Sequence, residues 1–127
     1  MQVANLFDVV ELIVDLPQHK LYAGMQGTVL EVHGDGKAFE IEFSDEQGQT
    51  LSFLALPPEQ IVLVWRAQEK QWLSMADRVA ALIARLPAPA GAEVLDFARF
   101  LSVRTHQRSR VQAANVLVAE PPTEYHT

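Results

Sequence analysis

Short apolar segments separated by turn residues fill the first half of the chain, a spacing typical of a small antiparallel β domain. Residues 37–43 alternate most clearly, because Phe39, Ile41 and Phe43 fall on one face and Glu40 and Glu42 on the other. This period of two indicates a half-buried strand. The pattern predicts five strands, at residues 8–15, 26–33, 37–43, 50–56 and 60–65, with a short helical turn at 57–60.

Turn residues separate the predicted strands. Glycines in the segments 34–36 and 46–48 tolerate the positive φ that tight hairpins need. Pro57 and Pro58 lack the backbone donor, so the chain must turn before the last strand. Five short strands cannot all hide one face in a small open sheet. We therefore expect an α+β protein whose residues 1–64 form a five-stranded, SH3-like antiparallel β-barrel.

The hydrophobic period changes after Trp65. Residues 65–73 are predicted to be a polar linker, and Ser74 is a candidate N-cap with Asp77 in the first turn. Apolar residues then recur at helical spacing up to Pro87, and a second helix is expected from about 90 to 108. The short connection predicts an antiparallel helical hairpin over 74–110. Residues 111–127 are expected to form a flexible tail.

Charge divides the 127-residue chain, whose formal net charge is −6. Residues 1–64 carry two lysines against ten acidic residues, whereas residues 65–110 carry eight Lys and Arg against four acidic residues. The acidic part should repel nucleic-acid phosphates. The basic part is suited either to attract phosphates or to dock on an acidic neighbour.

The cellular compartment that we expect for the protein follows from features that the sequence lacks. The chain has no cysteine, which excludes disulfides, thiolate metal sites and cysteine nucleophiles. No apolar run approaches the roughly 20 residues that cross a bilayer, and the first residues do not have the pattern of a secretory signal. We expect a soluble, cytoplasmic protein with no membrane partner.

No catalytic constellation is visible. The four histidines, His19, His33, His106 and His126, fall in four separate segments without metal-site spacing. The pair Glu40 and Glu42 lies on an outer strand face, where nothing supplies the apolar pocket that general acid catalysis needs. No Ser-His-Asp set with a local signature can be assembled. We therefore predict no catalytic residue, no cofactor, no metal and no enzyme activity.

Residues 6–64 resemble a family of small bacterial domains of unknown function that is common in cyanobacteria. The resemblance rests on the opening DVVELIVDLP, on Gly24-x-x-Gly27 followed by Thr28-Val29, on EIEF at 40–43, and on LP before the last strand. It implies an SH3-like barrel, distantly similar to that of the nitrile hydratase β subunit, and genes that often neighbour those of toxins.

A second resemblance covers the expected hairpin. Residues 75–103 resemble a family of small bacterial antitoxin-like helical proteins, and the similarity lies in the sequence LIARLPAPAGAEVLDFARFL at 82–101. Those proteins usually lack the barrel, so the combination here departs from their pattern. Both resemblances imply a toxin–antitoxin setting.

Two tryptophans and the second helix supply the candidate binding residues. Trp65 and Trp72 either pack the helices on the barrel or anchor a partner. A hairpin this small cannot bury every apolar residue of its second helix, so packing on the barrel, a homo-oligomer and a partner surface are all open. The candidate partner-binding set is Trp65, Trp72, Phe97, Phe100, Leu101, Val103, Val116, Leu117 and Val118.

A basic cluster ends the second helix. Arg104, Arg108 and Arg110 suit the negative end of the helix dipole, and nucleic-acid contact is the alternative. The interpretation that the sequence favours is a non-enzymatic protein–protein interaction module, antitoxin-like or an accessory partner of a bacterial toxin or enzyme. A nucleic-acid-associated module and an enzyme subunit or assembly factor are the alternatives.

Overall fold

The computed structural model describes residues 3–118, with side chains as far as Arg108. The chain divides between Arg85 and Leu86 into two compact units. The first unit holds the sheet and helix α1, and the second holds helix α2. The protein is thus α+β, as the change of hydrophobic period predicts.

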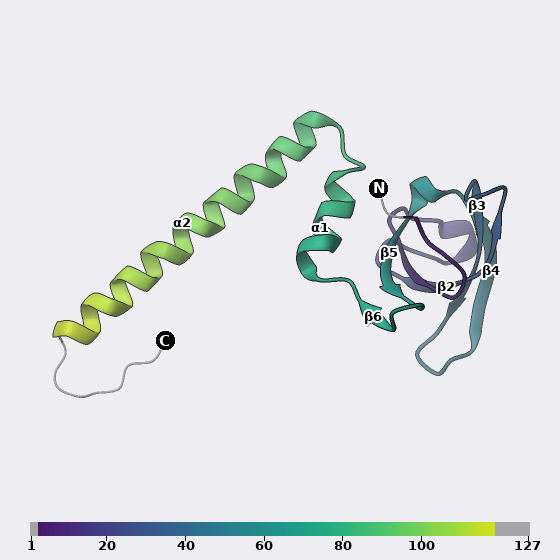
Figure 1. Cartoon of the computed structure of the whole chain (residues 1–127), viewed down its shortest axis with the longest axis horizontal. Coiled ribbons are helices and arrows are strands. Elements are labelled where there is room, and N and C mark those ends of the chain that lie inside the picture. The colour runs from purple at the N-terminus through teal and green to yellow at the C-terminus, as the bar shows by residue number, and fades with distance from the viewer. Residues whose placement is uncertain (1–2, 119–127) are drawn as a thin grey trace. The chain divides into compact units, whose positions relative to one another are not determined.

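Six antiparallel strands form one sheet in the order β4-β3-β2-β1-β5-β6 (Figure 1). All five predicted strands are present, and a sixth was missed. In the described part of the chain the sheet is open, with β4 and β6 at its edges, so the predicted barrel closure is not observed. The strands are β1 (Val9–Leu12), β2 (Gln26–His33), β3 (Ala38–Ser44), β4 (Thr50–Leu56), β5 (Ile61–Arg66) and β6 (Gln71–Trp72).

The sixth strand lies in the segment 65–73, for which the prediction of a linker was wrong. Trp65 belongs to β5, and Gln71 and Trp72 form β6, which pairs with the end of β5. A strand of two residues is too short to show an alternating pattern, so sequence periodicity could not reveal it.

Apolar residues at alternate strand positions form the core of the sheet unit. Phe39, Ile41 and Phe43 are fully buried, as predicted, and they share the core face with residues of β1, β2 and β5. Phe7 and Phe53 lie outside this core, and each is more than half exposed. Phe53 is the cross-strand partner of the outward-facing Glu42, so it lies on the outer face of the sheet.

A buried carboxylate ties the start of the chain to the β5–β6 hairpin. Asp8 is only 3% exposed. Its Oδ2 accepts a hydrogen bond from the backbone N–H of Asn5, and its Oδ1 accepts one from that of Ala67, both at 2.8 Å. The two bonds compensate the burial of the charge, and one of them joins residues 59 positions apart.

Helix α1 (Met75–Ile83) begins as predicted. The Ser74 Oγ accepts from the N–H of Asp77, and the side chain of Asp77 lies in the first turn. Arg78 forms an ion pair with Glu11 of β1 at 2.7 Å, which connects the helix to the sheet within the first unit. The predicted antiparallel packing of the two helices stays a prediction, because α1 and α2 belong to different units.

Helix α2 (Ala88–Val118) is longer than predicted at both ends. Pro89 lies in its first turn, where the missing N–H costs no hydrogen bond, and the N–H of Gly91 donates to the carbonyl of Pro87. The helix continues past Arg108, so the prediction of a flexible tail was wrong for 111–118; residues 119–127 lie outside the described part. Within 3–118, no helix combines the length and the apolar composition that crossing a membrane requires.

Candidate functional site

An exposed aromatic pair stands on α2. Phe97 and Phe100 are one turn apart, and their rings stack with centroids 6.2 Å apart and an angle of 25°. They are 62% and 54% exposed, and Val103 is 57% exposed. Leu101, from the same predicted set, is partly buried. We call the first three residues the α2 patch.

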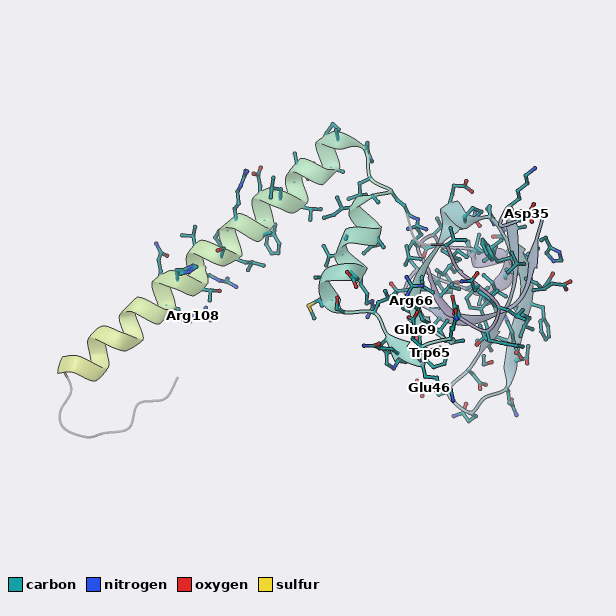
Figure 2. The ribbon with its side chains drawn as sticks, viewed as in Figure 1. Asp35, Glu46, Trp65, Arg66, Glu69 and Arg108 are labelled. Carbon is teal, nitrogen blue, oxygen red and sulfur yellow. The ribbon has the colours of Figure 1, made fainter. Side chains whose placement is uncertain are left out.

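The basic cluster adjoins the α2 patch. The Arg104 guanidinium carbon lies 5.3 Å from the centroid of the Phe100 ring, a distance typical of a cation–π contact. Arg108 is exposed farther along the helix, as labelled in Figure 2. The side chain of Arg110 and those of the run Val116-Leu117-Val118 lie outside the described part. Nucleic-acid contact at these arginines stays a prediction.

A second aromatic pair lies in the sheet unit. Trp65 and Trp72 are cross-strand partners in β5 and β6, and their rings meet edge to face with centroids 6.3 Å apart. Trp72 is 57% exposed, whereas Trp65 is partly buried. The sequence named both residues but not their contact, because the pairing depends on the unpredicted strand β6.

Trp72 is one of the residues that line a polar hollow. Arg66 and Glu69, which Figure 2 labels, line this hollow and form an ion pair at 3.5 Å. Asp77 of α1 contributes another carboxylate to the lining. The hollow has a volume of about 340 Å³ and is lined by Arg66, Glu69, Gln71, Trp72, Leu73, Ser74 and Asp77. Because charged residues line much of it, it suits a polar segment better than an apolar ligand.

Apolar residues of α1 are also exposed. Met75 is 82% exposed, and Val79, Leu82 and Ile83 are each about two-fifths exposed. Their spacing of three and four residues predicted the helix, but they are not among the candidate binding residues named from the sequence. Leu95 of α2, which is half exposed, is likewise absent from that candidate set.

Carboxylates gather on the outer face of β2 and β3 without forming a site. Glu31 lies directly opposite Glu40, and the His33 Nε2 is 3.4 Å from the Glu40 Oε1. No three His, Asp or Glu residues among the described ones are placed to share a metal ion. This face is therefore an acidic surface.

Comparison with known protein families gives a match for part of the chain. Residues 6–63 match the model of a family described as a domain of unknown function (DUF4926). The match covers the segment from just before β1 to β5 and leaves out β6 and both helices. Neither the curated proteins nor the solved structures include a match to this chain. Part of the sheet unit is thus similar to a family whose function is not known.

Proposed function

We propose that this chain is a non-enzymatic, cytoplasmic protein-binding module, an antitoxin-like or accessory partner of a bacterial toxin or enzyme. The α2 patch carries the proposal: two stacked phenylalanines lie exposed on a helix that forms a unit apart from the sheet. The strand order, with a 3-10 turn (Pro58–Gln60) just before β5, supports an SH3-like scaffold for the first unit.

Exposed aromatic area of this kind is costly to leave in water. Transfer of apolar surface out of water contributes about 25 cal/mol per Å², and aromatic side chains are enriched among the residues that dominate binding energy. The two ring centroids are 6.2 Å apart, so a single partner surface can cover both rings. A partner that covers the patch therefore gains more than one that covers a scattered surface.

The arginines of α2 indicate which kind of partner surface would fit the α2 patch. Arg104 lies against the patch, and Arg99 and Arg108 lie on the same helix. Arg99 is paired with Asp96, at 3.2 Å, but both members are largely exposed. A helix with apolar anchors and basic neighbours fits an apolar groove edged by carboxylates, the mode in which amphipathic helices are recognised.

The test compares two double variants of the tagged full-length chain in its native host. Phe97→Glu with Phe100→Glu removes the rings, and Ser102→Glu with His106→Glu adds the same charge on another face of the helix. After in-cell cross-linking, a partner should be recovered with the wild type and the control but lost with the patch variant. Circular dichroism checks that all three chains keep their helix content.

Recovery of the same proteins with all three chains would reject the patch as the binding surface. Light scattering on the purified chains separates self-association from binding to another protein. Salt-dependent binding to a labelled single strand of DNA or RNA, lost when Arg104, Arg108 and Arg110 become Ala together, would favour the nucleic-acid alternative instead.

A further inference from the structure

A cavity opens into the core of the sheet unit. Its floor is apolar and belongs to the core, with Val10 of β1, Phe39 of β3 and Leu63 of β5 each at most 4% exposed. The volume is about 190 Å³. The lining residues are Val3, Ala4, Val10, Asp35, Gly36, Phe39, Pro58, Ile61, Leu63 and Arg85, all from the first unit.

Arg85 is held at the wall of this cavity by two backbone carbonyls. Its Nη1 donates to the carbonyl of Ala81, one turn earlier, at 3.1 Å, and its Nη2 donates to that of Pro58 at 3.4 Å. Its Nε is buried and has no acceptor among the described residues. A buried donor without an acceptor is rare and unfavourable in folded proteins, so this one calls for a partner.

The charge of Arg85 is also not matched by a direct ion pair. No carboxylate of the described residues forms an ion pair with it. Burial lowers the pKa of Arg85, and the nearby Glu59 only partly opposes that effect. A partly buried arginine without an ion-pair partner gains from an anion that reaches it, because the guanidinium matches the geometry of a carboxylate.

We propose that this cavity binds a small apolar carboxylate, with one ring or branched aliphatic group on the floor and the carboxylate on Arg85. The size fits this class, since a cavity of about 150 Å³ is large enough for benzene. The carboxylate supplies the acceptor that the Nε lacks, and the apolar group covers the floor formed by Val10, Phe39 and Leu63.

Asp35 sets a limit on the ligand. It is exposed on the β2–β3 turn, where Figure 2 labels it, and it also lines the cavity. Its negative charge disfavours an anion nearby, so the ligand's single carboxylate belongs on the Arg85 side. The same chemistry occurs in a free carboxylic acid and in the C-terminal residue of a polypeptide, and the experiment distinguishes these two sources.

The test titrates the ¹⁵N-labelled full-length chain with 3-phenylpropionate and with its neutral amide, which has the same ring and chain. The acid should shift the amide signals of residues that line the cavity and should bind at least ten-fold more tightly than the amide. Equal binding of the two compounds, or no shift with the acid, overturns the proposal. This comparison uses the unmodified protein, so it does not depend on whether any variant folds.

Three variants and one control variant then locate the site. Arg85→Gln should weaken the acid at least ten-fold, and Val3→Phe should weaken acid and amide alike by filling the mouth at an exposed position. Asp35→Asn should tighten the acid several-fold, whereas Glu46→Gln, the same charge change on the β3–β4 turn, should leave it unchanged. Tightening by both charge variants would show non-specific attraction of anions and overturn the proposal.

Two peptides identify the source of the carboxylate. Gly-Gly-Gly-Phe with a free C-terminus and the same peptide amidated at that end are titrated in the same way. Tighter binding of the free-ended peptide than of 3-phenylpropionate supports capture of a partner's C-terminus. Binding of the small acid alone supports a free metabolite as the ligand. Neither result depends on the α2 patch, so the two proposals can fail separately.

Discussion

Gly24 and Gly27, two residues of the motif that carries the resemblance, are required for different reasons. Gly24 has φ +98°, and its N–H donates to the carbonyl of Leu12 at 2.7 Å, so it closes the loop between β1 and β2 in a conformation that other residues rarely adopt. Gly27 lies inside β2, and an added Cβ would be 2.6 Å from the Ile41 Cγ2 and 2.9 Å from the Glu42 carbonyl oxygen.

Gly27→Ala is expected to destabilise the sheet unit by about 1–3 kcal/mol, the usual cost of overpacking a filled core. Backbone as well as side-chain atoms would have to move, because the Glu42 oxygen belongs to the paired strand. Urea unfolding followed by tryptophan fluorescence measures the effect. Gly91→Ala, the same change inside α2, is the control and should leave the sheet transition unchanged; an unchanged transition for Gly27→Ala would contradict the packing argument.

Asp8→Ala is expected to cost about 1.5–3 kcal/mol for each of the two hydrogen bonds that its carboxylate accepts. The N–H groups of Asn5 and Ala67 would lose their acceptor. Thermal unfolding by circular dichroism measures the loss. Glu46→Ala removes an exposed carboxylate from the β3–β4 turn and should have little effect, so equal effects of the two variants would argue against the role of Asp8.

At the residue scale, the sequence predicted the regular positions and missed the particular contacts. Alternation identified Phe39, Ile41 and Phe43 correctly, because burial follows the period of a strand. Phe53 follows the same period, because it is paired with Glu42 on the outer face, but the sequence does not show which face of β4 meets the core. Arg85 had no signal at all, because its environment depends on Pro58, which is distant in sequence.

At the scale of elements, paired strands bring like charges together. Glu31 of β2 and Glu40 of β3 are directly opposite on the outer face, an arrangement that is destabilising in antiparallel sheets. Bounds of β2 and β4 were predicted exactly, since turn residues mark both ends of each strand. Bounds of α2 were not, because the prediction ended the helix at its basic cluster, whereas arginines are good helix formers.

Glu31→Gln is expected to stabilise the sheet unit by about 0.2–1 kcal/mol, the range for such cross-strand pairs. The gain arises from removing repulsion with Glu40, so it should shrink as added salt screens the charges. Chemical unfolding in urea at low and high salt measures both effects. Glu46→Gln is the matched charge control, and an equal gain from it would assign the effect to net charge rather than to the pair.

At the scale of the whole molecule, the sheet unit extends beyond the predicted barrel. Residues after 64 contribute the Ala67 N–H to Asp8, the Leu73 N–H to the carbonyl of Val64, and Arg78 to Glu11. The structural boundary after Arg85 therefore differs from the boundary suggested by the hydrophobic period. Periodicity marks where strands end, but it does not show which later segments return to the sheet.

A chain ending at residue 87 is expected to fold with the same sheet as the full-length protein, whereas one ending at residue 64 should be markedly less stable. The shorter chain leaves the buried Asp8 carboxylate without the Ala67 N–H, which costs about 1.5–3 kcal/mol. It also loses the ion pair of Glu11 with Arg78, which adds little because both side chains are partly exposed. NMR spectra of the backbone amides show whether each chain forms the sheet, and thermal unfolding compares the stability of the two chains. Equal stability of the two would place the boundary at 64.

The position of β1 has a consequence for how the protein is made. The first strand lies inside the sheet, between β2 and β5, and its neighbour Asp8 is bonded to Ala67. As the ribosome extends the chain, β2, β3 and β4 can pair in turn, but one side of β1 keeps its backbone groups unpaired until β5 emerges. Synthesis must therefore reach Arg66 before β1 is paired on both sides, and during that interval its open edge is exposed to wrong pairing.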